Sequence, residues 1–342
     1  MLESLGAQWL IFGLSALVIA VIGTRLTGMA DRLADQTGLG EAFFGAVFLG
    51  AITSLPGITA SVVAAIDDRP QLALSNALGG IAAQTVFLVI GDLVYRRANL
   101  EHAAASLENL LQSTLLIALL ALLLLAQLGP ELTIWGMHPV TPLLFLSYFF
   151  GQRLIMQARK DPMWRPHITG HTRRDEPDED CDNRGSGRLW AAFGASAVVI
   201  VVAGWALTKS AEKLGPALGL DDSIVGATMT GIATSLPELV TCIAAVRRGA
   251  LTLAVGGILG GNAFDTLFAG TADIAYRDGS LYHAAGPGEP WLLTMAMLMT
   301  AVLLLGLLRR ERGGPANIGF ESLTVLLIYL LGMWGLYELG QT

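Results

Sequence analysis

Long apolar stretches almost free of charge limit what this chain can fold into more than any other feature. Leu115–Leu128 and Leu292–Leu308 contain no charged residue. A helix that crosses a bilayer needs about 20 mostly apolar residues, and in lipid its backbone polar groups must be satisfied within the segment. Hydrophobic residues make up 53% of the sequence and charged residues 14%. The stretches are too long and continuous for barrel strands, so they predict an all-α membrane protein.

Ten such stretches predict ten spans with both termini on one side of the membrane. When the connecting loops are assigned alternately to the two sides, 17 of the 21 Lys and Arg residues lie opposite the termini. Cytoplasmic loops carry the excess of Lys and Arg, so both termini are expected outside the cytoplasm. The expected spans are about Trp9–Gly23, Glu41–Ile66, Gln71–Val94, Leu110–Leu128, Thr141–Met156, Leu189–Thr208, Asp222–Val246, Leu251–Ile274, Trp291–Leu308 and Ile318–Gly340.

One long polar loop, residues 158–188, divides the chain into halves of five spans, 1–157 and 189–342. Its acidic run, Asp175–Asp182, could form a regulatory cation site. Runs of like charge are usually solvated and disordered, so a linker is the preferred interpretation. The net charge of −7 lies mainly in loops and indicates no nucleic-acid partner; inorganic cations and the lipid bilayer are the expected partners.

The two halves contain copies of one segment. Gly45–Phe87 aligns without a gap on Gly226–Phe268 at a shift of 181 residues, with 16 of 43 positions identical and T-S-L-P in both. Beyond the segment, Asp92 matches Asp273. Five spans separate the copies, and because five is odd, the copies cross the membrane in opposite directions. The sequence therefore predicts inverted-topology repeats, which in secondary transporters place the binding site near the midplane.

Each T-S-L-P sequence interrupts an apolar helix. Proline removes a backbone donor and clashes with the carbonyl four residues earlier, so Pro56 and Pro237 are expected to free carbonyls in mid-membrane. Those carbonyls and the neighbouring Thr and Ser hydroxyls are hard oxygen ligands of the kind that Na⁺, Ca²⁺ and Mg²⁺ take. A plain proline kink remains the alternative, although two matched copies make it less favoured.

Two acidic residues are expected inside spans. Glu238 follows Pro237, and Asp265 lies well within the next span. A carboxylate at the centre of a membrane helix costs roughly 2.5–3.5 kcal/mol on insertion scales, and no Lys or Arg is expected at matching depth. A bound cation or proton is the simplest way to offset the charge, so Glu238 and Asp265 are the candidate metal ligands.

The second copy resembles a known family. Gly226–Thr241, GATMTGIATSLPELVT, and Gly256–Asp265, GGILGGNAFD, are similar to an α-repeat of the sodium/calcium exchangers, within the calcium:cation antiporter superfamily. The first copy shows the resemblance in weaker form. In that family two hairpins enclose a central ion site built from both T-S motifs, a glutamate after each proline and a further polar pair. Carried over by position, the resemblance implies an ion site formed by Thr53, Ser54, Gln84, Thr234, Ser235, Glu238 and Asp265.

Departures from the family pattern leave the transported ion open. Gly57 stands where the family has the first glutamate, Gln84 where it usually has asparagine, and Gly80 and Gly261 where it has serine. The resemblance implies a secondary active cation antiporter that works by alternating access. A monovalent cation/proton antiporter and a non-transporting sensor or scaffold are the alternatives. No nucleophile–base pair or metalloprotease motif indicates an enzyme, and no cofactor is expected besides the transported Ca²⁺, Na⁺ or H⁺.

Overall fold

The computed structural model describes residues 4–37, 54–95, 98–160, 162, 186–310 and 319–341. Apart from one isolated antiparallel bridge between Ile134 and Met137, the regular structure in these residues is helical. The all-α fold class is therefore confirmed. Thr53 and most of the polar loop, including Asp175–Asp182, lie outside the described residues.

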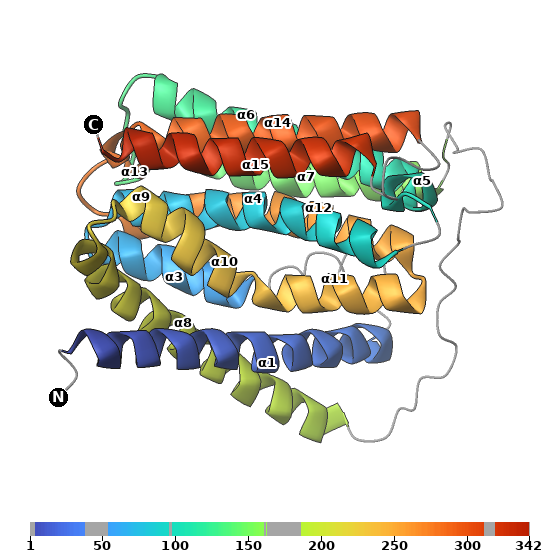
Figure 1. The fold of residues 1–342 in the computed structure, drawn as a ribbon, viewed down its shortest axis with the longest axis horizontal. Helices are drawn as coiled ribbons and strands as arrows, with labels where there is room; N and C mark the ends of the chain where they lie inside the picture. The colour runs from blue at the N-terminus through green and yellow to red at the C-terminus, as the bar shows by residue number, and fades with distance from the viewer. Residues whose placement is uncertain are drawn as a thin grey trace.

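The described helices follow the expected spans in order (Figure 1). The first half contains α1 (Leu5–Thr37), α3 (Leu55–Ile66), α4 (Pro70–Val94), α5 (Leu100–Ala104), α6 (Leu107–Leu128) and α7 (Val140–Lys160). The second half contains α8 (Ser186–Leu218), α9 (Asp222–Ile224), the π-helical η2 (Val225–Thr230), α10 (Gly231–Thr234), α11 (Leu236–Arg248), α12 (Leu251–Ala275), α13 (Leu281–Ala284), α14 (Gly288–Arg309) and α15 (Phe320–Leu339).

Length and composition qualify most of these helices to cross a membrane. Seven described helices are long and apolar enough, and the bent pair Asp222–Thr234 and Leu236–Arg248 is an eighth candidate. Helix α7, with 21 residues, occupies the place of a ninth expected span. The span expected at 41–66 is described only from Ser54 onward.

The 181-residue repeat extends over the helices of both halves. Adding 181 to the bounds of α1, α4 and α6 gives the bounds of α8, α12 and α14, residue for residue. Helices α3 and α11 agree to within one residue. The sequence identity of one segment therefore marks a duplication that the architecture retains far beyond that segment.

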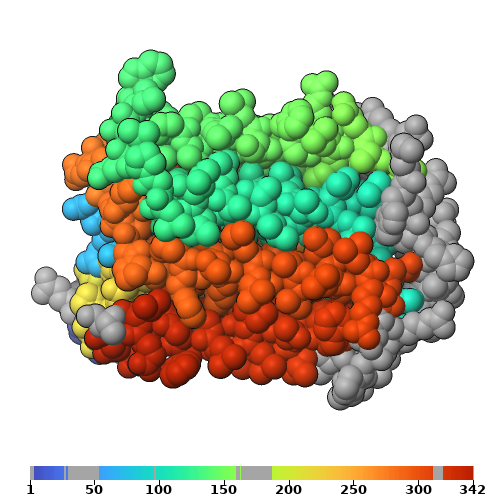
Figure 2. All heavy atoms as spheres, turned by 90° about the horizontal axis from the view of Figure 1, so that it is seen from above, coloured from blue at the N-terminus to red at the C-terminus, as the bar shows by residue number. Residues whose placement is uncertain are grey.

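The helices form three layers. Helices α7, α6, α14 and α15 lie side by side on one face (Figure 2). Beneath them lie α4 and α12, with α3 and α11, and α1 and α8 cross on the opposite side (Figure 1). Helices α4 and α12 are the most buried of the spans, with 78% and 72% of their apolar windows inside the protein. Both chain termini lie at the same end of the layers (Figure 1), which we call the terminal face.

Small residues let helices of opposite halves approach closely. A Cβ atom added to Gly23 of α1 would lie 2.5 Å from Cγ of Pro237, at the start of α11. A Cβ added to Gly204 of α8 would lie 3.2 Å from the carbonyl oxygen of Pro56, at the start of α3. The two glycines are related by the 181-residue shift, and so are the two prolines. Each crossing helix therefore packs on the proline break of the other half.

Asp92 and Asp273 anchor connecting loops rather than line a cavity. Asp92, near the end of α4, accepts hydrogen bonds from the backbone nitrogens of Leu100 (2.8 Å) and Gly319 (3.2 Å). It also accepts a hydrogen bond from the Ser322 hydroxyl at 2.9 Å. A buried carboxylate held by several donors fixes the segments that supply them.

The same anchor recurs in the second half. Asp273 accepts hydrogen bonds from the backbone nitrogens of Leu281 (3.1 Å) and His138 (2.8 Å) and from the Thr141 hydroxyl. Each of these partners is related to a partner of Asp92 by 181 residues. The duplication has thus preserved individual polar contacts as well as helix bounds.

We expect loss of either anchor to destabilise the protein. Asp273→Ala and Asp92→Ala each remove three hydrogen bonds to a buried carboxylate and should cost roughly 2–4 kcal/mol. This loss should lower the melting temperature in detergent by about 5–10 °C. Asp278→Ala, at an exposed position at the same end of α12, is the matched control and should change it little. An unchanged melting temperature in both anchor variants would contradict this role.

Candidate functional site

The polar T-S segments lie at helix breaks. In the second half, the segments Asp222–Thr234 and Leu236–Arg248 meet at a bend of 47°. The break falls at Ser235 (φ −93°, ψ 5°), two residues before Pro237. Ser54 occupies the equivalent place before α3 with nearly the same backbone angles, φ −84° and ψ −1°. Proline cannot continue the helical hydrogen-bond ladder, so each copy ends one helical segment at its serine and begins another.

A hydrogen-bonded cluster joins the two breaks in the protein interior. Asp265 of α12 is 1% exposed, and it accepts hydrogen bonds from Oγ of Ser54 (2.7 Å) and Nε2 of Gln84 (2.6 Å). Nε2 of Gln84 also donates to Oγ of Ser235 at 3.2 Å. Ser54, Gln84 and Ser235 are buried as well. We call these four residues the central cluster.

The central cluster has the symmetry of the repeat. Gln84 and Asp265 are 181 residues apart, and so are Ser54 and Ser235. Each serine contacts the α4 or α12 residue of the opposite half. The copies are thus brought together around one pseudo-twofold axis, and the only acidic member of the cluster is Asp265.

Close backbone contact lets the cluster form. A Cβ atom on Gly79 of α4 would lie 2.2 Å from Cα of Ala227 in η2. One on Gly231 of α10 would lie 2.9 Å from the backbone nitrogen of Gly80. Larger side chains would separate α4 from the second hairpin, so the glycines serve the close helix packing that small residues permit in membranes.

The other expected site residues lie around the central cluster. The Thr234 hydroxyl donates to the carbonyl oxygen of Thr230 at 2.8 Å, within its own hairpin. Glu238, in the first turn of α11, is buried at 7% exposure, three residues beyond Ser235. Thr53 is not among the described residues. Four of the seven expected residues, the central cluster, therefore share one hydrogen-bond network.

A further polar pair lies one turn from the central cluster and was not among the expected residues. Nδ2 of Asn262 donates to Oγ1 of Thr85 at 3.0 Å, and both side chains are buried. The sequence carried a signal for Asn262, because the second copy retains the asparagine of the family pattern where the first copy has Ile81. Asn262 precedes Asp265 by three residues and so lies on the same side of α12.

An aromatic ring fills the place of the missing first-copy glutamate. A Cβ atom on Gly57 would lie 2.4 Å from Cε2 of Phe268 and 3.0 Å from its Cζ. Any side chain at position 57 would overlap this ring unless the ring moved. The substitution that distinguishes the first copy from the second is therefore built into the packing of α3 against α12.

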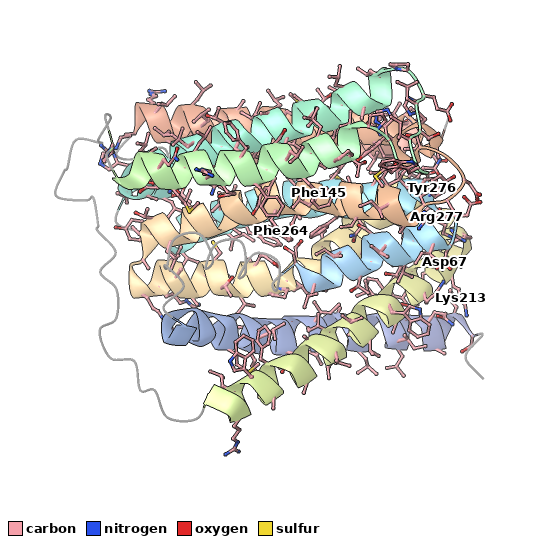
Figure 3. All side chains as sticks on the ribbon, turned by 180° about the vertical axis from the view of Figure 1, so that it is seen from behind. Asp67, Phe145, Lys213, Phe264, Tyr276 and Arg277 are labelled. Carbon is pink, nitrogen blue, oxygen red and sulfur yellow. The ribbon has the colours of Figure 1, made fainter. Side chains whose placement is uncertain are left out.

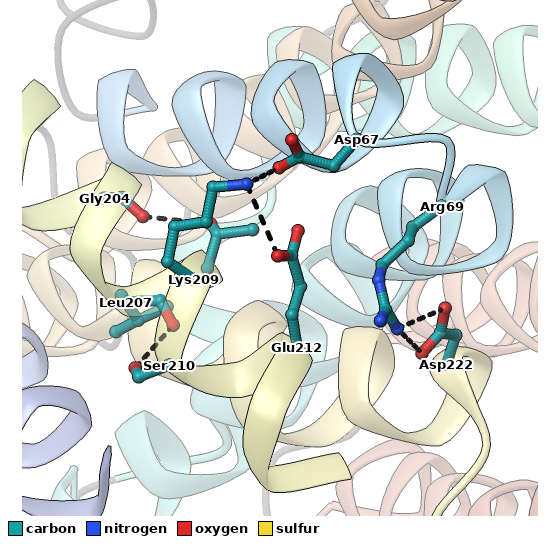
Figure 4. A network of polar contacts seen from close by, with 9 residues as sticks. Asp67, Arg69, Gly204, Leu207, Lys209, Ser210, Glu212 and Asp222 are labelled. Carbon is teal, nitrogen blue, oxygen red and sulfur yellow. Dashed lines mark hydrogen bonds and ion pairs between the residues drawn. The ribbon is translucent and has the colours of Figure 1, made fainter. Parts of the chain in front are cut away.

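The ion pairs of the described residues lie away from the central cluster. Arg69 pairs with Asp222 at 2.9 Å, and Lys209 of α8 pairs with Asp67 (Figure 4). Asp67 lies at the terminal face, whereas Phe264, adjacent to Asp265, lies midway along the layers (Figure 3). The hydrogen-bond donors to Asp265 are neutral.

Oxygen atoms are the ligands that this site can offer. No three His, Cys, Asp or Glu side chains gather closely enough to hold a metal ion within the described part of the chain. The central cluster instead combines one carboxylate with hydroxyl and amide oxygens. Such hard, mixed oxygen donors suit Na⁺, Ca²⁺ or a proton better than a soft metal.

Comparison with known proteins finds one family. The family model described as sodium/calcium exchanger protein matches residues 7–156 and 188–337. The chain is 25% identical over 306 residues to the putative antiporter CaxA of Alkalimonas amylolytica, covering 88% of this chain and 91% of that protein. It is 29% identical over 266 residues to the inner membrane protein YrbG of Escherichia coli, covering 76% of this chain and 77% of that protein.

A solved structure shares the fold. The crystal structure of the H⁺/Ca²⁺ exchanger CAX matches with a TM-score of 0.73 at 12% identity, over 97% of this chain and 85% of that chain. At that level of identity the likeness extends to the fold alone. The expected arrangement of two repeats in a membrane protein is thereby supported independently of the sequence motifs.

We expect Gly57→Glu alone to be poorly tolerated, because the new side chain would overlap Phe268. The double variant Gly57→Glu/Phe268→Ala removes the ring and should recover folded protein. Yield of monodisperse protein and melting temperature measure the difference, and overpacking of this kind typically costs about 1–3 kcal/mol. Phe268→Ala alone is the control. Equal stability of the two Gly57→Glu variants would contradict the steric account.

Proposed function

Because the chain belongs to the sodium/calcium exchanger family, we propose that it is a secondary active cation antiporter whose ion binds at the central cluster. The observation that carries this proposal is the hydrogen-bonded meeting of Ser54 and Gln84 with Ser235 and Asp265. These residues come from both halves and are buried at the axis that relates them. Inverted repeats of transporters place their substrate sites at such an interface.

The charge of Asp265 supports a cation as the ligand. Burying an ionised carboxylate costs much free energy unless the charge is paired, and the observed donors are a hydroxyl and an amide. A cation at Asp265 would supply the missing pairing. The hydroxyl oxygens of Ser54 and Ser235 would turn their lone pairs toward it, and Glu238 would add a second carboxylate from the start of α11.

Gln84 would act as an ion ligand through the oxygen of its amide. In this structure its Nε2 occupies the space between Asp265 and Ser235, and its Oε1 has no hydrogen-bond partner among the described residues. A rotation of the amide would direct Oε1 toward a cation and withdraw the nitrogen. Gln84 would thereby satisfy Asp265 when no ion is bound and release it when one is.

Alternating access would involve the crossing helices. Helices α1 and α8 pack on the proline breaks mainly through small residues, Gly23 and Gly204. Contacts made by glycine present little side-chain surface to interlock, so α1 and α8 can slide or rock over the breaks. The two halves, 1–157 and 189–342, would each contribute one hairpin to the site. The loop 158–188 would lie on the cytoplasmic side, with both termini outside.

The loss of the first-copy glutamate favours a second candidate function. Phe268 fills the space beside Gly57, so the site has Glu238 and Asp265 as its acids. Two acids balance one divalent ion but offer fewer oxygens than the six to eight that Ca²⁺ prefers. Exchange of a monovalent cation for protons, which a single protonatable carboxyl can support, is therefore the alternative within the same fold.

We expect Asp265→Asn to reduce transport at least about tenfold, equivalent to about 1.4 kcal/mol or more of lost stabilisation. The measurement is the initial rate of Ca²⁺ uptake into liposomes under an outward sodium gradient and, separately, under an outward proton gradient. Asp278→Asn, exposed at the end of α12, is the matched control and should transport normally. A normal rate in Asp265→Asn would reject the central cluster as the site. An absence of cation flux in the unmodified protein would reject antiport.

We expect Glu238→Gln to separate the two candidate functions. If the transported ion is Ca²⁺, loss of the second carboxylate should weaken apparent Ca²⁺ affinity about tenfold or more, because charged ligands set the strength of calcium sites. Monovalent cation/proton exchange should depend on Glu238 mainly through its pH profile. Both are measured in the same liposomes, with sodium-driven and proton-driven flux recorded over a range of pH. An unchanged affinity and an unchanged profile would remove Glu238 from the site.

A further inference from the structure

A second buried carboxyl lies outside the central cluster. Glu289, in the first turn of α14, has no exposed surface. Its Oε1 accepts hydrogen bonds from Oγ of Ser75 on α4 (2.8 Å) and from Oγ of Ser223 on α9 (2.7 Å). The carboxyl thus joins a hydroxyl from each half of the protein at the beginning of a span.

The other oxygen of Glu289 faces the terminal face. Oε2 is buried and has no hydrogen-bond partner in the part of the chain that the structure describes. A Cβ atom added to Gly286, in the loop before α14, would lie 3.7 Å from this oxygen and 3.2 Å from Nε2 of Gln71. Gly286 and Gln71 are both partly exposed. The space that Oε2 borders is therefore the layer of protein directly beneath solvent.

The surroundings of Glu289 supply no cation to neutralise it. Arg69, at the start of α4, is paired with Asp222 at 2.9 Å (Figure 4). Asp221, the N-cap of α9, adds a like charge. Helix α15 packs here through Leu336, beside Gly288. A buried carboxylate must be paired or neutralised, and among these neighbours only neutral hydroxyls hydrogen-bond to it.

The repeat shows that the fold does not require this arrangement. Shifted by 181 residues, Glu289, Ser75 and Ser223 correspond to Glu108, Gly256 and Ala42. Both hydroxyls are absent from the first-half counterpart, and Glu108 is partly exposed. The helix bounds and loop anchors are duplicated, so the buried, hydroxyl-supported carboxyl is a feature added at one end only.

We propose that Glu289 is a proton-binding site at the terminal face, separate from the central cluster. A proton from water at that face forms an O–H bond with Oε2, while Ser75 and Ser223 continue to donate to Oε1. Ser75 precedes Gln84 by nine residues on α4, which is about 13 Å along the helix. The site loads from the side on which the termini lie and does not depend on whether the central cluster transports an ion.

The test follows the protonation of this carboxyl directly. Infrared difference spectra of the full chain in lipid nanodiscs, recorded as the pH is stepped in a buffer of choline salts, detect the C=O stretch of a protonated buried carboxyl. We expect a band that titrates in the unmodified protein and is lost in Glu289→Gln. Glu108→Gln, the counterpart in the repeat, should retain it. A band unchanged by Glu289→Gln would overturn the proposal.

Two further variants keep the proposal testable if Glu289→Gln does not fold. Ser75→Ala and Ser223→Ala leave the carboxyl in place and remove one donor each, so each should move the titration midpoint by about one pH unit, which corresponds to the 1.4 kcal/mol of about one hydrogen bond. A midpoint unmoved by both would contradict the site. A band that responds to added Na⁺ at constant pH would assign the carboxyl to a metal cation instead. A titrating band in a protein without cation flux would reject only the proposed antiport.

Discussion

The carboxylate of Asp265 is the feature on which the interior of this protein depends. It lies in the middle of a membrane helix, where an ionised group is costly, and it is held by Ser54 and Gln84 from the opposite half. Hydrogen bonds to a charged group contribute roughly 1.5–3 kcal/mol each. They can form only because the glycines of α4 let its backbone approach the second hairpin. Small residues and buried polar residues are thus two parts of one requirement.

The duplicated halves have kept their scaffold and changed their chemistry. Asp92 and Asp273 fix equivalent loops with equivalent partners, because every copy of the fold needs those loops in place. The polar interior differs between the halves. Gln84 faces Asp265, and Gly57 with its covering ring of Phe268 stands where the second copy has Glu238. Contacts that hold the architecture are symmetric, whereas the charge available to a ligand is concentrated in the second half.

Much of the fold could be predicted from the sequence because its causes are local. Runs of apolar residues specify helices that cross a bilayer, and the T-S-L-P repeats specify where two of them break. The family assignment, too, was reached from the second copy of the motif and is confirmed by the match over both halves. Asn262 and Glu289 were missed, since their surroundings are made by residues such as Thr85 and Ser75 that are distant in the chain.

The sequence by itself determined the helical membrane fold, the duplication and the residue types available for binding a cation. It did so because hydropathy, proline geometry and repeat spacing act along the chain. Only the tertiary structure decided that Gln84 donates to Asp265, that Phe268 replaces a glutamate beside Gly57, and that Glu289 is buried while Glu108 is not. Those outcomes depend on which side chains of α4, α12 and α14 meet across the halves, and packing in three dimensions, rather than spacing in the chain, sets those meetings.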